Sequence, residues 1–410
     1  MTELDKSQNK KYIVNDLFLA CMCKRNLDVR GTKILLLVGK EMFSRVRRRI
    51  DDKDIPIICK FLQRNNDVIA VNLAYNNITD RGMETIINFL EENDSVLDLN
   101  LMNNNITENG IIQLSQARNL KLKSLRVNGN KIGPKGLKSL VMMLSSNSTL
   151  THLDVGETDM DISALAYFTT VLRTNNTVQA VNFNRILGPL GHTLQTDHVA
   201  DLLQQMLVIN NTLRELHLQK IGFVDHDIEL LVEGLKHNSS ILLLDLSCNN
   251  FGDHGVERLA EYIGRSPLQT LMVSSNNIRD SGARSLSMKF PYSRITFMDI
   301  SKNHITEEGV LDILNCLKKE HPIQGLFIRG NQIGEKACKV LYRMLLSGVL
   351  SNDTLDVNLH CERGSYHYSS SHAADHVKPH YYCLCSSTYQ RMCSNCDVTV
   401  VRGKKPVDKL

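Results

Sequence analysis

Short stretches of alternating apolar and polar residues recur along the chain, and each is followed by apolar residues at helical spacing. The stretch Leu242–Leu259, which reads LLLDLSCNNFGDHGVERL, shows the pattern most clearly. Leu244 and Leu246 lie on one face of a predicted strand, because side chains alternate along a strand. Val256 and Leu259 then begin a predicted helix with one apolar stripe. A single unit of this kind cannot bury its own apolar face, so the pattern predicts a stack of units.

An asparagine that stands three residues after an aliphatic strand position sets the register of these units. Seven asparagines occupy this slot: Asn76, Asn104, Asn130, Asn249, Asn276, Asn303 and Asn331. Consecutive asparagines among the first three, and among the last four, are 26, 27 or 28 residues apart. In the middle of the chain the slot falls at Thr158, Ile186 and Ile221, and the last two are 35 residues apart, which predicts an insertion. Because an asparagine side chain can hydrogen-bond the backbone of a turn, we expect these residues to be structural and not catalytic.

A period in the high twenties with the pattern L-x-L-x-x-N-x-I and a following helix is that of a leucine-rich repeat of the strand-plus-helix type. We therefore predict an α/β horseshoe solenoid, with a parallel sheet inside and helices outside. The curvature follows because strands about 4.8 Å apart must join helices about 8–10 Å apart. Residues 1–50 are predicted to form an N-terminal cap and a degenerate first strand, residues 51–350 the solenoid, and residues 351–410 a cap strand and a tail rich in His and Cys. Asp52 is predicted to cap the helix that follows it.

The composition and motifs of the chain argue against several classes of function. The formal net charge of +4 over 410 residues does not favour a nucleic-acid binder. No apolar run approaches the roughly 20 residues needed to span a bilayer, and the first residues lack the pattern of a secretory signal. The cysteines do not form a disulfide framework, so we expect a reducing compartment, cytosolic or nuclear. The repeats contain no catalytic set and no cofactor motif, which predicts a non-enzymatic protein without cofactor.

Side chains between and after the aliphatic strand positions are predicted to face the concave side of the solenoid. The candidate partner-binding residues there are Asn100, Met102, Arg126, Asn128, Asp154, Asn182, Asn184, His217, Asp245, Met272, Asp299, Phe327 and Arg329. The three aspartates and two arginines give this set a net charge of about −1 with His217 neutral. A mixed polar strip suits a protein partner, whereas a nucleic-acid groove needs many Lys or Arg residues. Each aspartate is also explained as ordinary repeat consensus, and that alternative stays open.

The insertion between the slots at Ile186 and Ile221 is a second candidate contact. It reads ILGPLGHTLQTD from Ile186 to Asp197, and its glycines and proline predict an irregular loop. Leu187, Leu190 and Leu194 either tuck this loop onto the solenoid or contact a partner.

The tail carries a candidate metal site. Cys383, Cys385, Cys393 and Cys396 form two close thiol pairs that could hold a tetrahedral zinc. A single residue separates the first pair, however, and the loop between the pairs has seven residues, so uncommitted thiols are the other interpretation. The basic run Arg45–Arg49 predicts a solvated loop, with a nuclear import signal or a contact to an acidic partner as alternatives.

The repeats resemble the ribonuclease-inhibitor class of leucine-rich repeats from about residue 51 to residue 346. VNFNRIL (Val181–Leu187) with the insertion after it, LRELHLQK (Leu213–Lys220), LLDLSCN (Leu243–Asn249) and KPHYY (Lys378–Tyr382) are similar to the vertebrate family of leucine-rich repeat-containing protein 34. This resemblance implies a nuclear and nucleolar protein of germ and stem cells that is linked to ribosome production. It also implies acidic, chaperone-like nucleolar proteins as partners.

These features predict a non-enzymatic scaffold for protein–protein interaction, and three other functions are alternatives to it. A structural scaffold of motile cilia is compatible with the repeats. An activator of a small GTPase also uses this repeat type, but the family of that kind ends in a long acidic run, whereas this chain ends in His and Lys residues. A ribonuclease inhibitor would need a strongly acidic inner face with aromatic residues, and the strip counted above is nearly neutral.

Overall fold

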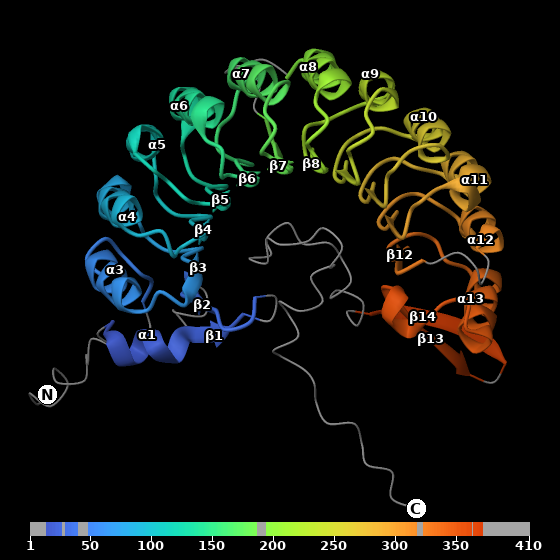
Figure 1. Cartoon of the computed structure of the whole chain (residues 1–410). Helices are drawn as coiled ribbons and strands as arrows, with labels where there is room; N and C mark the ends of the chain where they lie inside the picture. Colours follow the sequence, from blue (N-terminus) through green and yellow to red (C-terminus); the bar gives the residue numbers. More distant parts are fainter. Residues whose placement is uncertain are drawn as a thin grey trace, which may run out of the picture.

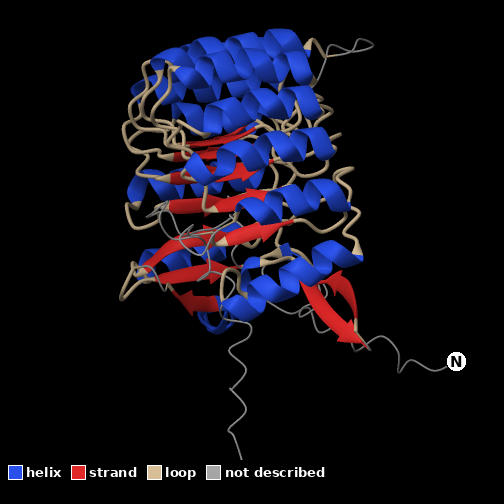
Figure 2. Ribbon diagram, turned by 90° about the vertical axis from the view of Figure 1, so that its right-hand side faces the viewer, coloured by secondary structure: helices blue, strands red, loops and turns tan. Residues whose placement is uncertain are grey.

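The computed structural model describes residues 14–26, 29–39, 48–186, 194–317, 323–362 and 364–371. Figure 1 shows a horseshoe in which strands line the inner side and helices form the outer side. In Figure 2 the strands are stacked as parallel rungs behind rows of helices. The predicted α/β leucine-rich repeat solenoid is therefore confirmed.

The described strands form one twelve-stranded sheet in chain order, and β1 is antiparallel to β2 while the later neighbours are parallel. Its strands are β1 (Cys23–Arg25), β2 (Lys33–Leu36), β3 (Val68–Asn72), β4 (Asp98–Asn100), β5 (Ser124–Arg126), β6 (His152–Asp154), β7 (Ala180–Asn182), β8 (Glu215–His217), β9 (Leu243–Asp245), β10 (Thr270–Met272), β11 (Phe297–Asp299) and β12 (Gly325–Phe327). A separate hairpin, β13 (Val357–Glu362) and β14 (Ser365–Ser370), follows the last helix. One cap strand was expected there from the sequence.

The described helices from α3 onward form the outer side of the horseshoe, and α1 lies at its N-terminal end beside β1 (Figure 1). They are α1 (Asp16–Met22), α3 (Ile55–Arg64), α4 (Asp80–Glu92), α5 (Glu108–Gln116), α6 (Gly133–Ser146), α7 (Ile162–Leu172), α8 (Thr196–Ile209), α9 (Asp225–Lys236), α10 (Asp253–Ile263), α11 (Asp280–Lys289), α12 (Glu307–Cys316) and α13 (Glu335–Ser347), with short 3-10 turns at Phe290–Tyr292 and Asn352–Thr354. In the described part of the chain, no helix has the length and apolar character needed to cross a membrane.

One continuous apolar core runs between the sheet and the helices through all repeats. Leu244 and Leu246 on the strand side and Val256 and Leu259 on the helix side are fully buried in it. The stack of units is thus the source of the hydrophobic burial, because no repeat encloses these side chains alone.

The asparagine slot forms a hydrogen-bonded ladder, as predicted. Asn249 Oδ1 accepts from the N–H groups of Ile221, Gly222 and Phe223 in the preceding repeat, at 3.1, 2.9 and 3.2 Å. Its Nδ2 donates to the carbonyls of Leu218 and Leu246. Each such side chain satisfies buried backbone groups that the short strands leave unpaired.

A second ladder joins the helix starts and corrects the expectation for Asp52. Helix α3 begins after Asp54, so Asp52 does not cap it. The Asp52 carboxylate instead accepts from the N–H and the hydroxyl of Thr79, at 2.8 and 2.6 Å, where Thr79 caps helix α4 of the next repeat. Asp80 and Asp280 make the same contacts to Thr107 and Thr306. An acid at one helix start thus meets the unpaired N–H groups of its neighbour.

The middle of the solenoid uses a different ladder at the opposite edge. Where the strand-side slot holds Thr158, Ile186 and Ile221, asparagines before the strands take over the bridging role. Asn210 Nδ2 donates to the carbonyl of Leu172 at 2.6 Å, and Asn238 Nδ2 donates to the carbonyls of Leu207 and Asn210. This second ladder overlaps the regular one, because Asn238 and Asn249 lie before and after the same strand.

Candidate functional site

Strand register brings most of the predicted concave residues into one row. Paired positions on neighbouring strands run Asn100, Arg126, Asp154, Asn182, His217, Asp245, Met272, Asp299 and Phe327 from β4 to β12. Met102, Asn128, Asn184 and Arg329 follow two residues later, just beyond the strand ends. Sequence alternation alone therefore predicts which residues share this face.

The row is far less accessible than the sequence suggests. Asp245 and Asp299 have no exposed surface, and His217 is 1% exposed. At the end of the sheet, 28% of the Arg329 side chain is exposed. These side chains form a tight polar layer and not a loose surface, so their pairing with one another decides their charge.

A further row of concave residues was missed from the sequence. These residues stand at the first position of each strand, two before the main row, and therefore face the same side. They include Asp98, Ser124, His152, Glu215, Leu243, Thr270 and Phe297. Applying the alternation one step upstream would have found them. Adding Asp98 and Glu215 changes the net formal charge of the face from about −1 to −3.

A buried charge cluster lies at the centre of the concave face. His217 Nδ1 is 3.5 Å from Asp245 Oδ2, and His217 Nε2 is 3.5 Å from Glu215 Oε2. Burial lowers the pKa of His217, but the two carboxylates outweigh it and raise the pKa to about 9. Burial raises the pKa of Asp245, yet the contact with His217 leaves it below its ordinary value. The Gln219 amide also donates to Asp245. The centre therefore holds a protonated histidine between two carboxylates at neutral pH.

Asp154 lies beside this cluster and keeps one oxygen without a hydrogen-bond donor among the described residues. Its Oδ1 accepts from the Gly156 N–H at 3.1 Å and from Asn182 Nδ2 at 2.8 Å, whereas Oδ2 is buried and unsatisfied. Burial raises the pKa of Asp154 to about 7. A cavity of about 20 Å³ opens here, lined by Arg126, His152, Leu153, Asp154, Val181, Asn182 and His217. That volume accommodates one water molecule or one small polar group.

Three buried apolar side chains, 3% exposed or less, form the concave apolar patch at the C-terminal end of the sheet: Met272, Phe297 and Phe327. They form a cluster separate from the main core. The Phe297 and Phe327 rings meet edge to face with centroids 5.0 Å apart. Gly325 makes this possible, because a Cβ there would overlap the Phe297 ring. In the main row Met272 lies between Asp245 and Asp299, so the patch has acidic neighbours.

The structure describes the flanks of the insertion after Ile186 and one end of the basic run. Ile186 is buried and Leu194 packs against the core, so both flanks of the insertion are anchored. Leu187 and Leu190 lie outside the described residues, as do Cys383, Cys385, Cys393 and Cys396. Among residues that are described, no three His, Cys, Asp or Glu side chains are placed to hold a metal ion. In the basic run, Arg48 pairs with Asp54 at 2.7 Å, and Arg45–Arg47 lie outside the described part.

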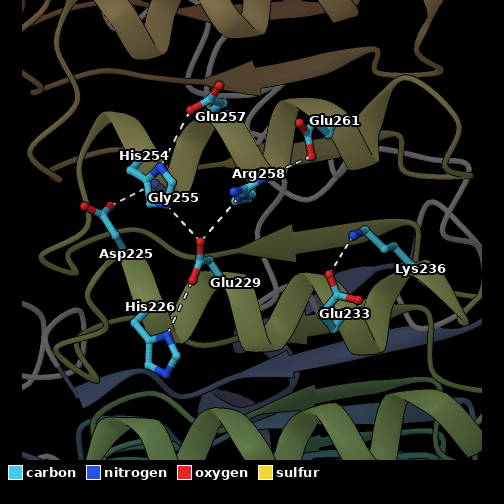
Figure 3. Close-up of polar contacts among 10 residues, drawn as sticks. All are labelled: Asp225, His226, Glu229, Glu233, Lys236, His254, Gly255, Glu257, Arg258 and Glu261. Atoms are coloured by element: carbon cyan, nitrogen blue, oxygen red, sulfur yellow. Dashed lines mark hydrogen bonds and ion pairs between the residues drawn. The ribbon is translucent and has the colours of Figure 1, made fainter.

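A second polar cluster lies on the outer helices α9 and α10 (Figure 3). Glu229 accepts from His254 at 2.8 Å and lies 3.4 Å from His226 and 3.3 Å from Arg258. Contacts with His254, His226 and Arg258 lower the pKa of Glu229. The cluster is open to solvent, so it contributes little to stability and forms no enclosed site.

Comparison with known proteins identifies the repeats. A family model described as "Leucine Rich repeat" matches residues 64–86, 118–141, 237–260 and 266–287. The chain folds as a leucine-rich repeat solenoid. The same strand, turn and helix recur between and beyond the matched segments of the solenoid. No curated protein matches the chain.

Several solved structures are similar to the solenoid at low sequence identity. Actin-binding site 2 of leiomodin-1 is 18% identical, with 33% of this chain and 76% of that chain covered and a TM-score of 0.29. An internalin from Listeria monocytogenes is 18% identical, with 66% and 76% covered and a TM-score of 0.32. The yeast complex of Rad7 and Elc1 is 11% identical, with 74% and 79% covered and a TM-score of 0.45.

Proposed function

We propose that this chain is a non-enzymatic scaffold that binds protein partners through its concave face. Leucine-rich repeat domains generally mediate protein–protein interaction, which supports a binding role. The observation that carries the proposal is that one face joins a buried charge cluster, around His217, to the concave apolar patch. A preorganised arrangement of charges on one continuous face is suited to specific recognition of a protein partner.

The charge of this face narrows the class of partner. With Asp98 and Glu215 included and His217 protonated, the concave face carries five acidic and three basic side chains, a net formal charge of about −2. Electrostatic complementarity therefore favours a partner segment with basic and large apolar side chains. We propose that any acidic, chaperone-like nucleolar partner binds a different surface of the chain.

The resemblance to a nucleolar family supplies the cellular setting of the proposal. We propose that the scaffold acts in the nucleus, the nucleolus and the cytoplasm and is linked to ribosome production in germ and stem cells. Proximity labelling with nucleolar and ciliary markers separates this role from that of a ciliary scaffold. Labelling of ciliary proteins alone would overturn the nucleolar part of the proposal and leave the binding role in place.

A matched pair of substitutions in one repeat tests the binding face. Ser274 follows β10 on the concave side and Met288 is 61% exposed on helix α11 of the same repeat. Ser274→Arg places a long side chain over the concave face, whereas Met288→Arg places it on the outer face. We expect Ser274→Arg to lower capture of the partners about tenfold or more, and because Ser274 is only 8% exposed, circular dichroism must show that the variant is folded. Equal capture by both variants would contradict concave binding.

A further inference from the structure

The loops that lead from each helix to the next strand concentrate positive charge at one edge of the solenoid. The helix-end edge is defined here as the loops from α5 to β11, with the last residues of α9 and α11 included: residues 117–123, 147–151, 173–179, 210–214, 236–242, 264–269 and 289–296. Nine Lys or Arg residues lie there and no Asp or Glu. The edge therefore has a formal charge of +9, and 4 − 9 leaves −5 for the rest of the chain.

Backbone hydrogen bonds join these loops into one continuous row. The Thr151 N–H donates to the Lys123 carbonyl, and the Leu242 N–H donates to the Arg214 carbonyl, both at 2.8 Å. An equivalent bond of 2.7 or 2.8 Å joins each neighbouring pair of loops from β5 to β11. Because neighbouring strands are about 4.8 Å apart, six such steps give the row a length of about 29 Å at the strand ends. The basic side chains thus lie along one band of the surface.

The cations of the helix-end edge are accessible. Six of the nine are exposed residues of the loops themselves: Arg118, Lys121, Lys123, Arg214, Arg265 and Arg294. None of these six side chains forms an ion pair with a described carboxylate. At the opposite edge, by contrast, Lys220 pairs with Glu157 at 3.2 Å. Only Lys236 and Lys289 lie in the last turn of a helix, so compensation of the helix dipole does not account for the other cations.

The neutral side chains of the helix-end edge favour a nucleic-acid backbone over a protein partner. Exposed amides and hydroxyls accompany the cations: Asn119, Ser148, Thr174, Asn176, Asn211 and Ser239. Together with Lys and Arg, such groups contact phosphate and sugar oxygens, and they can also bind the 2′-hydroxyl of RNA. The core of a protein interface is instead rich in large apolar side chains. Within the loops of this edge, all of them described, Tyr292 is the one large apolar residue that is exposed.

The curvature of the solenoid favours a single strand over a duplex. The repeats from α5 to α11 follow the arc of the horseshoe, so the row of loops is curved (Figure 1). Duplex DNA is stiff on this scale, with a persistence length of about 150 base pairs, whereas a flexible single strand can follow the arc. Tyr292 is 78% exposed and offers one ring for base stacking. The remaining contacts would be to the backbone, so binding should depend little on sequence.

We propose that the helix-end edge binds the sugar-phosphate backbone of single-stranded RNA, with Lys121, Lys123, Arg214 and Arg265 among its phosphate contacts. This surface is separate from the concave face, so the proposal does not depend on the proposed function. It departs from the expectation drawn from the net charge of +4, because that sum combines a basic edge with an acidic remainder. A solenoid with both surfaces would hold a protein partner beside an RNA strand.

Fluorescence anisotropy with the full-length protein and a labelled uridine 20-mer tests this contact. The edge variant is Lys121→Glu, Lys123→Glu, Arg214→Glu, Arg265→Glu. The matched control, Arg81→Glu, Lys131→Glu, Lys135→Glu, Arg279→Glu, makes the same change of charge with exposed residues at the opposite edge.

We expect the edge variant to bind the RNA at least tenfold more weakly than the unmodified protein, and the control less than threefold more weakly. The slope of log K against log salt should become shallower by about 2–3 in the edge variant, since each lost phosphate contact removes about 0.7. Circular dichroism checks that both variants are folded. If the edge variant is unfolded, Lys121→Gln with Lys123→Gln replaces it, with an expected loss of at least threefold.

No saturable RNA binding by the unmodified protein, or equal losses in the edge and control variants, would overturn the inference. Binding of polyglutamate as tight as that of the RNA would also overturn it and would assign the edge to an acidic protein. Equal affinity for a deoxythymidine 20-mer would contradict the assignment to RNA. Partner capture by Ser274→Arg is a separate measurement, so the failure of either proposal can be told from the failure of the other.

Discussion

His217 Nδ1 lies 3.5 Å from Asp245 Oδ2 across two neighbouring strands, and both side chains are almost completely buried on the concave face. Glu215 holds the other ring nitrogen at the same distance. The folded protein therefore binds a proton on His217 that the unfolded chain releases near its ordinary pKa of about 6.5.

The pH dependence of stability should report this proton. The contribution of His217 to the free energy of unfolding is fully present below about pH 6.5 and is lost as the pH rises through about 9. Asp245→Asn removes a carboxylate from the pair, so we expect a loss of about 3 kcal/mol at pH 6 and a much smaller loss at pH 10. Urea unfolding at the two pH values measures both numbers.

Asp299→Asn is the matched control for that experiment. Asp299 is equally buried in the same row, but its carboxylate accepts from the N–H and hydroxyl of Ser301 and does not contact His217. Its substitution should alter the change in stability between pH 6 and pH 10 less than Asp245→Asn does, because its charge acts on the pKa of Asp356, which it helps to raise to about 6, and not on that of His217. If the free energy of unfolding of Asp245→Asn changed with pH as it does in the unmodified protein, the result would contradict the charge pair of His217 and Asp245.

Asp154 should show the same sign of pH dependence in a lower window. Its pKa of about 7 in the folded state lies above its ordinary value, so the fold favours the protonated carboxyl. The stability that this group contributes is greatest below about pH 4 and is lost as the pH rises through about 7. Asp154→Asn keeps an acceptor for the Gly156 N–H. We expect the free energy of unfolding of this variant to be about 1–3 kcal/mol higher than that of the unmodified protein at pH 8, and not higher at pH 4. A lower stability than the unmodified protein at pH 8 would argue against this account.

The asparagine ladder predicts an unequal pair of alanine substitutions. Asn249 makes five hydrogen bonds to buried backbone groups, so Asn249→Ala should lower the free energy of unfolding by about 2–4 kcal/mol. Asn277 is exposed and donates one hydrogen bond, to the carbonyl of Asn250. Asn277→Ala should therefore change the free energy of unfolding by less than about 0.5 kcal/mol. Chemical denaturation of both variants checks the difference, and similar losses would show that the ladder has no special role.

The concave apolar patch predicts a destabilising glycine substitution with a rescue. Gly325→Ala places a methyl group into the Phe297 ring and should cost about 1–3 kcal/mol. Its backbone does not adopt a left-handed conformation, so crowding and not backbone strain is the cause. Adding Phe297→Leu should recover at least half of the loss, because the shorter side chain vacates the space. Thermal unfolding of the single and double variants measures the recovery, and additive losses would place the clash elsewhere.

The repeat pattern predicts the fold well because each apolar position has only one way to be buried. Leu244, Leu246 and Val256 lie in the core as expected, and Asn249 bridges two repeats as expected. The sequence could not show that Asp52 reaches Thr79, because that contact depends on how two helix starts align in space.

The candidate site was predicted in outline and not in its chemistry. Alternation places Asp154, His217 and Asp245 on one face, but strand register decides that His217 meets Asp245, while one Asp154 oxygen has no donor in the described part of the chain. Glu215 was missed because it stands one alternation before the residues counted from the sequence. Its contact with His217 changes the charge state of the centre.

Photo-cross-linking in cells tests the central claim, recognition through the concave face, most directly. Benzoylphenylalanine is placed at Ser274 or, in a matched protein, at Met288, and the cross-linked partners are identified by mass spectrometry. The account predicts adducts with other proteins from position 274 and few or none from position 288. Adducts that form from position 288 while position 274 captures no partner would contradict it.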